Sequence, residues 1–560
     1  MSFVSDDLDG ASWDEIEPYM NNLRDRELNC STCLENFISD RSDLSEIISE
    51  ARARLYINMT CHTDDEDIQK AWMDFVENVA PKLSEYSDIL NRRIIEHDAV
   101  NDLPKQYEIL IKGLKTNIEI FREENIPLQT RVTKLDTKYD EICGSQIIEF
   151  DGEKKTIPQM AIYLENTDRS IRENAWRAVA ERRFQDSEKL SEIFDEMIQI
   201  RHKIATNAGF EGYQQYMFAA MHRFDYTIDD CLEFHDSIES VCQPLRHKND
   251  EDRKQKLGLE KLRPWDMGVD IRGRPPLKPF KEVKEMVDGC SRIFHSMSKE
   301  LGDYFDLLEA NDCLDLDSRK GKAPGGYQYY LQKSRIPFIF MNAAGTQRNV
   351  ETMIHEAGHA FHSFYSGHLQ LIHERDAPIE FAEVASMSME LLTHPYWGEF
   401  YEEKDADRAR RNHLEDIIAF MPWMATIDAF QHWIYANPEH TREERAAKWL
   451  ELGKRFGPDI DMSGLNDIHE VSWQRQGHLF GVPFYYVEYG IAQLGALQMW
   501  QYHRKDTKDA LSRYKDGLSL GYTRGLTELF EASGLALSFS ESHVSNLMNE
   551  IELTLETIPS

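Results

Sequence analysis

The residues with the clearest chemical potential are the run His355-Glu356-Ala357-Gly358-His359. Two histidines four positions apart lie on one face of a helix, with Cβ atoms about 5–6 Å apart, so both imidazoles can bind one tetrahedral Zn²⁺. The glutamate after the first histidine then lies beside the metal, where it can take a proton from a bound water. The pattern predicts that His355 and His359 bind zinc and that Glu356 is the catalytic base.

A catalytic zinc site of this kind also needs a third protein ligand and an open position. A third histidine at position 365 would indicate the metzincin arrangement of three zinc-binding histidines, but that residue is Tyr365. His362 lies one turn beyond the pair, and we expect it to be packed or to support a ligand. A helix predicted to start near residue 376 carries Glu380 and Glu383 on one face. The residues alone leave both glutamates open as the third ligand.

The segments around this motif predict helices interrupted by small sheets. Asn349 is a fair N-cap and Gly367 a natural end for the helix that carries the histidines. Before it, two aromatic and branched runs at 327–330 and 336–342, bounded by Gly and Pro, predict paired strands. Alternating residues at 147–150 followed by Asp151-Gly152 predict a β-hairpin.

The rest of the chain is dominated by amphipathic helical patterns, and Gly (29) and Pro (19) are both sparse in its 560 residues. Ser12 with Glu15 suggests a capping box for the first helix. Four prolines fall within 263–280, which predicts a long irregular connection. We expect a mainly α protein with an N-terminal helical region at 1–145 and a catalytic region at 146–560, or one continuous two-lobed domain.

Composition limits the classes of partner. The 64 basic and 99 acidic residues give a net charge of −35, which argues against nucleic acid and anionic membrane surfaces. No window approaches 18 uncharged apolar residues, and the N-terminus lacks the pattern of a signal peptide, so we expect no membrane span and a cytoplasmic protein. The eight cysteines are expected to be free thiols, with no metal role for Cys30 and Cys33.

Several runs together resemble the thimet oligopeptidase and oligoendopeptidase F family of zinc metallopeptidases. Besides the HExxH motif they are Leu-Arg-Pro-Trp-Asp at 262–266, Pro-Gly-Gly-Tyr at 324–327, Phe-Ile-Phe-Met-Asn at 338–342, Phe-Ala-Glu-Val-Ala-Ser at 381–386 and His-Leu-Phe-Gly-Val-Pro-Phe-Tyr-Tyr-Val-Glu-Tyr-Gly at 478–490. The matches extend from about residue 147 to 500. The length of the chain and the last run favour the oligoendopeptidase F branch.

The resemblance implies a fold and a completed metal site. The fold would be a large helical body divided by a deep substrate channel, with one or two small β-sheets near the zinc. Glu383 would be the third ligand, and Ser386 and Glu390 would hold the histidines in place, as metal-bound imidazoles generally require.

The resemblance also implies groups that face the zinc from the 478–490 run. His478 and a tyrosine would stabilise the oxyanion of the tetrahedral intermediate, which needs hydrogen-bond donors at that point. Tyr485, Tyr486 and Tyr489 are the candidates, and we favour Tyr486 and Tyr489 as catalytic residues. The strand at 338–342 is expected to bind the substrate backbone by strand addition.

The sequence therefore predicts a zinc-dependent endopeptidase that hydrolyses oligopeptides, with one Zn²⁺ per chain and short unstructured peptides as partners. One alternative is a helical HExxH carboxypeptidase or dipeptidyl carboxypeptidase, which would need a cationic group for the free C-terminus that the sequence does not identify. Another is a non-catalytic, zinc-stabilised peptide-binding protein. If acidic residues line the channel, basic peptides should be preferred, and the preference should fade with salt.

Overall fold

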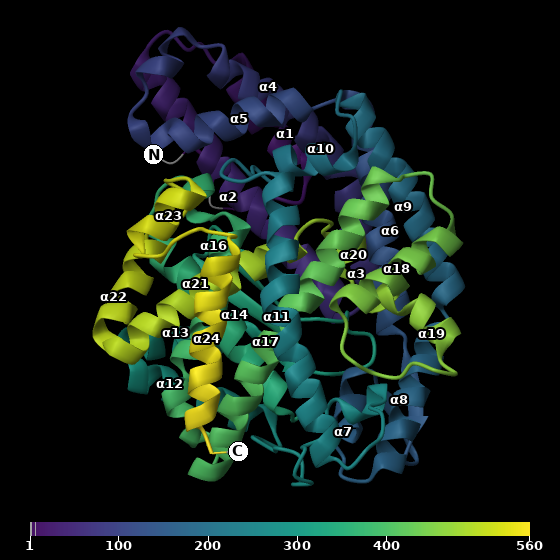
Figure 1. The fold of residues 1–560 in the computed structure, drawn as a ribbon. Coiled ribbons are helices and arrows are strands. Elements are labelled where there is room, and N and C mark those ends of the chain that lie inside the picture. The colour runs from purple at the N-terminus through teal and green to yellow at the C-terminus, as the bar shows by residue number, and fades with distance from the viewer. Residues whose placement is uncertain (1–2, 6, 560) are drawn as a thin grey trace.

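The computed structural model describes residues 3–5 and 7–559, and its chain is mainly α-helical with two small sheets (Figure 1). The predicted fold class is confirmed. The helices that precede the first sheet are α1 (Trp13–Asp25), α2 (Ser31–Cys61), α3 (Glu66–Asp74), α4 (Ala80–Ile95), α5 (Glu108–Ile120) and α6 (Ile126–Gly144).

Most of the remaining helices lie below the N-terminal helices in the view of Figure 1. Between the two sheets lie α7 (Ala161–Leu164), α8 (Arg169–Phe184), α9 (Ser187–Asn207), α10 (Tyr213–Ala220), α11 (Ile228–Lys256), α12 (Val283–Met297) and α13 (Lys299–Ala310). After the second sheet follow α14 (Gln347–Ser366), α15 (Ile372–Arg375), α16 (Ile379–Leu392), α17 (Glu403–Ala436), α18 (Arg442–Phe456), α19 (Asn466–Glu470), α20 (His478–Gly481), α21 (Tyr486–Lys505), α22 (Thr507–Leu518), α23 (Leu526–Ala532) and α24 (Glu541–Thr557).

The first sheet is the predicted hairpin of β1 (Ile147–Phe150) and β2 (Glu153–Thr156). Its loop residues Asp151 and Gly152 both have positive φ, which a two-residue hairpin of this kind requires. The second sheet contains β3 (Leu314–Asp317), β4 (Tyr327–Leu331) and β5 (Ile336–Ala343) in the order β3-β5-β4. β4 and β5 are the predicted pair, whereas the short parallel strand β3 was not predicted.

Helices from distant parts of the chain cover this second sheet. Ala53 and Ile57 of α2 share an apolar cluster with Leu331 and Phe340 of the sheet. α14 follows β5 directly and packs against both β4 and β5. The N-terminal helices also share a second apolar core, formed by residues from Val4 to Leu114 together with Leu371. The boundary between residues 145 and 146 stays a prediction.

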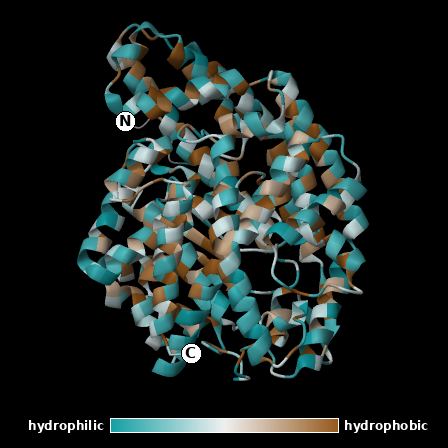
Figure 2. Ribbon diagram, in the orientation of Figure 1, coloured by the Kyte–Doolittle hydropathy of each residue, from teal (hydrophilic) through white to brown (hydrophobic). Residues whose placement is uncertain are grey.

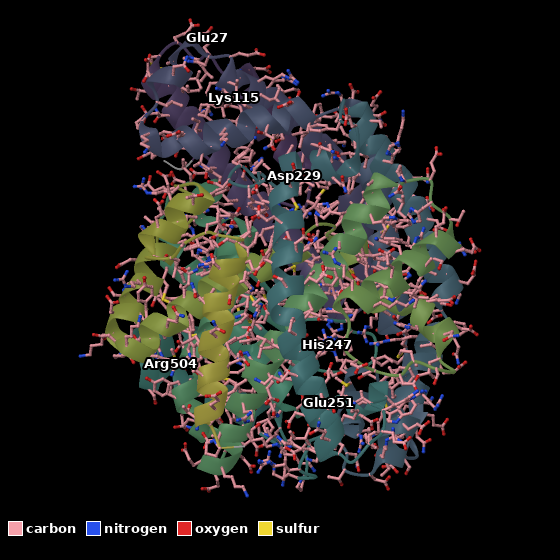
Figure 3. The ribbon with its side chains drawn as sticks, viewed as in Figure 1. Glu27, Lys115, Asp229, His247, Glu251 and Arg504 are labelled. Carbon is pink, nitrogen blue, oxygen red and sulfur yellow. A yellow bond between two sulfur atoms is a disulfide. The ribbon has the colours of Figure 1, made fainter. Side chains whose placement is uncertain are left out.

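Hydrophobic residues concentrate on the inward faces of the central helices (Figure 2). Ionisable side chains cover the outside, among them Glu27, Lys115 and Arg504 (Figure 3). Within the described part of the chain, no helix is both long and apolar enough to cross a bilayer. The segment 263–280 is irregular apart from the single 3₁₀ turn Pro264–Asp266, as its prolines predicted.

Two local expectations are wrong. Cys30 and Cys33 form a disulfide at the start of α2, so this pair is not free, while six other described cysteines are. Ser12 precedes α1 but its side chain makes no capping hydrogen bond, and Glu15 accepts from the backbone N–H of Asp9 and not from that of Ser12.

Candidate metal centre and active site

Helix α14 carries the two histidines of the HExxH motif. It begins at Gln347, three residues before the predicted start, because Thr346 is the N-cap. The Thr346 N–H and hydroxyl both donate to Oδ1 of Asn349, at 3.0 Å each, so Asn349 closes the capping box from inside the helix. Within α14, His355 and His359 lie on one face with ring centroids 4.9 Å apart.

A close approach between α14 and α16 brings the third candidate ligand to the histidines. A Cβ atom at Gly358 would lie 2.6 Å from Cα of Ser386, so only glycine allows the two helix backbones to pack this tightly. Glu383 lies one turn before Ser386 and reaches the face that carries His355 and His359.

The donor atoms of these three residues have the spacing of a tetrahedral zinc site. Oε2 of Glu383 lies 3.2 Å from Nε2 of His355 and 3.4 Å from Nε2 of His359. Ligand bonds of about 2.0–2.1 Å at tetrahedral angles separate two donors by about 3.3 Å. The three side chains therefore fit a zinc ion, with all their ligand atoms within 4.8 Å of one another. Glu380, the other open candidate, turns away and accepts a 2.5 Å hydrogen bond from Tyr226.

Glu390 holds His355 from behind, as the sequence predicted. Oε1 of Glu390 lies 2.6 Å from Nδ1 of His355, and Oε2 lies 2.8 Å from Nε2 of His413. His413 in turn contacts His394 at 2.8 Å, which extends a chain of hydrogen bonds into the core. Burial would raise the pKa of Glu390, but its two histidine partners outweigh it and lower the pKa well below the usual range. Neither His394 nor His413 lies in a motif, so the sequence carried no signal for them.

Glu383 is held by two hydroxyl groups. Ser386 donates to its Oε2 at 2.9 Å, and Tyr485 donates to its Oε1 at 2.6 Å. Ser386 thus supports the carboxylate and not a histidine, which differs from the expectation. These two donors fix the direction in which the carboxylate faces His355 and His359.

Glu356 is buried beside the three candidate ligands, and its Oε2 has no hydrogen-bond partner among the described residues. Burial raises its pKa above the usual value. A Cβ atom at Gly326 would lie 3.4 Å from Oε1, so the backbone that leads into β4 passes next to this carboxylate. An unpaired buried oxygen at this position can accept a proton from a water or a peptide.

His478 and Tyr489 face each other across 3.2 Å, from Nε2 to the phenolic oxygen. Gln476 donates to Nδ1 of His478 at 2.6 Å, so Nε2 carries the proton and can donate it. Burial lowers the pKa of His478 to about 4, which keeps the ring neutral near pH 7. The negative charges of Glu383 and Glu356 contribute to raising the pKa of Tyr489, after burial, so Tyr489 lies close to the candidate metal site.

The three tyrosines of the 478–490 run have different surroundings. The Tyr486 hydroxyl accepts a 3.1 Å hydrogen bond from Nε1 of Trp423, and Tyr485 is bonded to Glu383. Tyr489 is the tyrosine whose hydroxyl meets His478. The geometry therefore favours Tyr489 over Tyr486 as a donor to substrate, and it gives Tyr485 a supporting position.

The strand at 338–342 does not have a free edge, so the expectation of strand addition there is wrong. β5 is the central strand, paired with β3 on one side and β4 on the other. β4 is the edge strand of this sheet next to Gly326 and Glu356. An extended peptide that adds to the sheet on this side would pair with β4.

A cavity of about 510 Å³ adjoins the site. Its wall is formed by α6, α8, the segment 156–164, the loop that ends in Gly325, and the 3₁₀ turn Ser472–Arg475. Gly325 precedes the glycine beside Glu356, and Arg475 lies three residues before His478. The cavity lies where the family resemblance implies a substrate channel.

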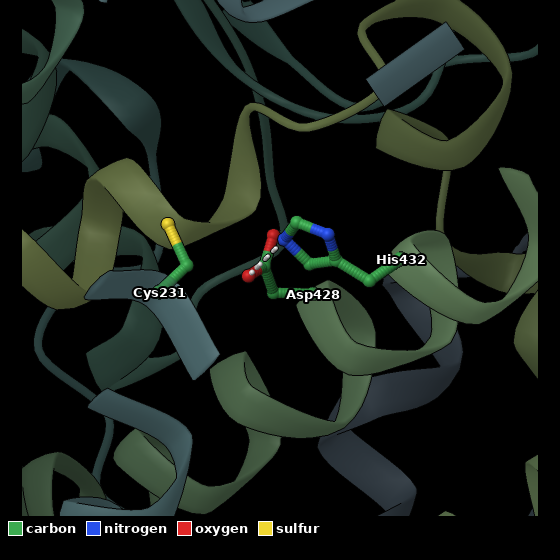
Figure 4. A group of neighbouring side chains, drawn as sticks. All are labelled: Cys231, Asp428 and His432. Atoms are coloured by element: carbon green, nitrogen blue, oxygen red, sulfur yellow. Dashed lines mark ion pairs between the residues drawn. The ribbon is translucent and has the colours of Figure 1, made fainter. Parts of the chain in front are cut away.

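A second group of potential metal ligands lies away from this site, between α11 and α17. Cys231, Asp428 and His432 are all buried with ligand atoms within 4.8 Å of one another (Figure 4). Oδ2 of Asp428 already contacts two imidazoles, at 2.8 Å to His235 and 3.3 Å to His432. These contacts outweigh burial and lower the pKa of Asp428, so the group pairs charges at a helix interface.

The family model of Peptidase family M3 matches residues 162–548. The chain belongs to this family. Among curated relatives, an oligoendopeptidase F homolog of Borreliella burgdorferi is 23% identical. The matched region covers 94% of this chain and 90% of the homolog. Oligopeptidase PepF of Bacillus subtilis is 24% identical over 72% of this chain and 59% of its own length. The solved structure of PZ peptidase A with an inhibitor is 26% identical, with a TM-score of 0.94 over 98% of both chains.

The predicted membership of the oligoendopeptidase F group is therefore confirmed. M3 membership also makes the chain a peptidase and points to short peptides as substrates.

Proposed function

We propose that this M3 peptidase is a zinc-dependent endopeptidase that cleaves oligopeptides. The observation that carries the proposal is the 3.2 and 3.4 Å spacing of Glu383 Oε2 from the histidine Nε2 atoms of His355 and His359, with the unpaired Oε2 of Glu356 beside them. His355, His359 and Glu383 would hold one zinc ion. When bound, zinc supplies Lewis-acid polarisation of the scissile carbonyl and acidifies a water.

Glu356 would act as the general base. Its Oε2 accepts a proton from the attacking water as the new C–O bond forms, and the protonated carboxyl then gives that proton to the leaving nitrogen. Burial suits this task, since a carboxylate out of water takes a proton more readily than an exposed one. Glycine at position 326 keeps a side chain away from this carboxylate, since a Cβ atom there would lie 3.4 Å from Oε1 of Glu356.

His478 and Tyr489 would stabilise the oxyanion. Nε2 of His478 and the Tyr489 hydroxyl oxygen are 3.2 Å apart, so both can donate to one substrate oxygen that lies to one side of the pair. Because Gln476 occupies Nδ1, the proton stays on the nitrogen that faces the site. Tyr485 and Glu390 would act by orienting Glu383 and His355.

The endopeptidase activity is favoured over an exopeptidase by the names of the curated relatives. A carboxypeptidase would require a free C-terminus, so it should fail on a peptide whose C-terminus is amidated. A non-catalytic peptide-binding protein would have no use for an unpaired buried glutamate next to three convergent donors.

The test is mass spectrometry of a mixed peptide digest treated with the wild-type protein, with and without a zinc chelator. We expect internal cleavage that the chelator abolishes and zinc restores. The Glu356→Gln variant should retain zinc and peptide binding and lose at least about a thousandfold in turnover, because its amide cannot accept the proton. Cleavage by Glu356→Gln at the wild-type rate, or activity that survives chelation, would contradict the proposal.

A further inference from the structure

The cavity beside the active site has an unusual charge composition for this chain. Among the described residues that line it are four cationic side chains, Arg183, Arg319, Lys322 and Arg475, and no aspartate or glutamate. The whole chain has 99 acidic and 64 basic residues. The condition for a preference for basic peptides, an acidic channel, is therefore not met in this cavity.

Two of the four cations already share a carboxylate of the protein. Oδ1 of Asp315 lies 2.6 Å from Nη1 of Arg319 and 2.8 Å from Nζ of Lys322. Three backbone carbonyls also accept hydrogen bonds from Lys322. These contacts hold both side chains to the sheet and occupy donors that could otherwise bind a ligand.

Arg183 and Arg475 have no such partner. Over residues 3–5 and 7–559, neither guanidinium has a hydrogen bond or a carboxylate within 4.0 Å; Arg475 only lies over the Trp423 ring at 5.1 Å. Arg183 is half-buried and Arg475 is exposed. Desolvation of its guanidinium and then the charge of Arg183 lower the pKa of Arg475 to about 10, so the two cations lie close enough to repel each other. Two neighbouring guanidinium groups without a counter-charge attract an anion.

We propose that the cavity is an anion subsite in which Arg183 and Arg475 bind a carboxylate of the peptide substrate. This inference rests on the proposed function for its link to cleavage. Guanidinium groups bind carboxylates through paired, charge-assisted hydrogen bonds, and the apolar remainder of the wall suits the side chain next to that carboxylate. Two sources share this chemistry: the free C-terminus of the peptide and an acidic side chain.

The strand direction connects the subsite to the proposed cleavage point. β4 runs from Tyr327 to Leu331, with Gly326 beside Glu356 and Gly325 on the cavity wall before it. A peptide that pairs antiparallel to β4 runs in the opposite direction, so its C-terminal part passes Glu356 and then enters the cavity. Antiparallel pairing thus directs the C-terminal part of the substrate, after the scissile bond, towards Arg183 and Arg475.

The test compares two matched pairs of short quenched-fluorescence peptides: a free C-terminal acid against its amide, and an internal Glu against Gln. We expect wild-type kcat/KM to favour the carboxylate member of at least one pair by about 10- to 100-fold, the range of a hydrogen bond to a charged group. Arg183→Gln/Arg475→Gln should reduce that ratio to near one. Arg319→Gln is the matched control, because Asp315 already pairs with Arg319 on the same wall.

The pair that responds identifies the source of the carboxylate. Arg183→Lys/Arg475→Lys should retain part of the preference, which separates loss of charge from loss of structure. In the wild-type protein the preference should also fall as salt is raised, and this measurement needs no variant. Equal rates within both pairs, or a preference that survives Arg183→Gln/Arg475→Gln, would overturn the proposal.

Equilibrium binding keeps this result separate from the proposed function. The same ratios are measured as Kd values on Glu356→Gln protein by fluorescence anisotropy. If the wild-type protein cleaves no peptide but the carboxylate members bind more tightly, the anion subsite is supported and the proposed activity is contradicted. If it cleaves all four peptides equally, the proposed activity is supported and the anion subsite is contradicted.

Discussion

The Tyr485 hydroxyl donates a 2.6 Å hydrogen bond to Oε1 of Glu383, while Oε2 of the same carboxylate faces His355 and His359. The two oxygens of Glu383 are therefore not equivalent. Oε1 is held by a half-buried tyrosine on the segment before α21, whereas Oε2 accepts from Ser386 at 2.9 Å and also faces the two histidines. This relationship makes Tyr485 a residue that positions a ligand, and it separates Tyr485 from its neighbour Tyr489.

Tyr485→Phe should weaken zinc binding by about 10- to 100-fold, because Oε1 of Glu383 loses its donor and the carboxylate can rotate. Tyr489→Phe should leave zinc affinity within about twofold and instead lower kcat. Tyr486→Phe is the control, since its hydroxyl contacts Trp423. Competition with a metal chelator measures the affinities. Equal zinc affinity in wild type and Tyr485→Phe would contradict the assignment.

Gly358→Ala should destabilise the protein by about 1–3 kcal/mol, since the new methyl group would lie 2.6 Å from Cα of Ser386 and force α14 and α16 apart. The same displacement should separate Glu383 from the histidines and lower zinc affinity. Denaturant unfolding with and without zinc measures both effects. Gly398→Ala is the matched control because a Cβ there meets nothing within 4 Å. An unchanged midpoint for Gly358→Ala would show that the helices yield without cost.

His478→Phe should lower kcat by about 100- to 1000-fold, the usual cost of removing an oxyanion donor. Because burial lowers the pKa of His478 to about 4, the ring stays neutral between pH 5 and 8. The ratio of wild-type to His478→Phe activity should therefore be constant over that range. Rates at several pH values with a fixed peptide check this. A ratio that changes through pH 6–7 would mean that His478 exchanges a proton during turnover.

His362 is buried against Phe381, and burial with the nearby charge of His359 lowers its pKa to about 3. Below pH 6.5 the imidazole of His362 is protonated in the unfolded chain but stays neutral in the folded chain, so the free energy of unfolding falls as the pH falls. At pH 4.5 the loss in the free energy of unfolding is about 2–3 kcal/mol. The His362→Leu substitution removes this loss. Denaturant unfolding of the chelator-treated proteins at pH 7 and pH 4.5 tests this prediction. The stability of His362→Leu relative to wild type should be higher at pH 4.5 than at pH 7. The same stability difference at both pH values would refute the role of His362.

The site residues that were predicted most directly from the sequence are those that lie within one helix. His355, Glu356 and His359 are related by helical periodicity, so their spacing alone placed them on one face of α14. The choice between Glu380 and Glu383 depended on the rotation of α16 against α14, which the contact of Gly358 with Ser386 determines. The family resemblance selected Glu383 where spacing could not.

Groups brought together by tertiary packing had no sequence signal. His413 reaches Glu390 from α17, and Arg183 and Arg475 are 292 positions apart in the chain. The roles of Tyr485 and Tyr486 could not be told apart from the sequence. The direction of each hydroxyl depends on how the start of α21 packs, which no motif encodes. Strand β3 alternates leucine and aspartate over 314–317, but its parallel pairing with β5 has no turn signal in the sequence, unlike the hairpin of β1 and β2.

The contrast between an acidic exterior and a cationic cavity has a consequence for the timing of binding. A net charge of −35 repels an acidic peptide during its approach, so encounter is slow, whereas Arg183 and Arg475 would prolong its stay once inside. Raising the ionic strength should speed arrival and shorten residence at once. Basic peptides would arrive quickly and leave quickly. The surface of the molecule and its interior would thus rank the same peptides in opposite orders.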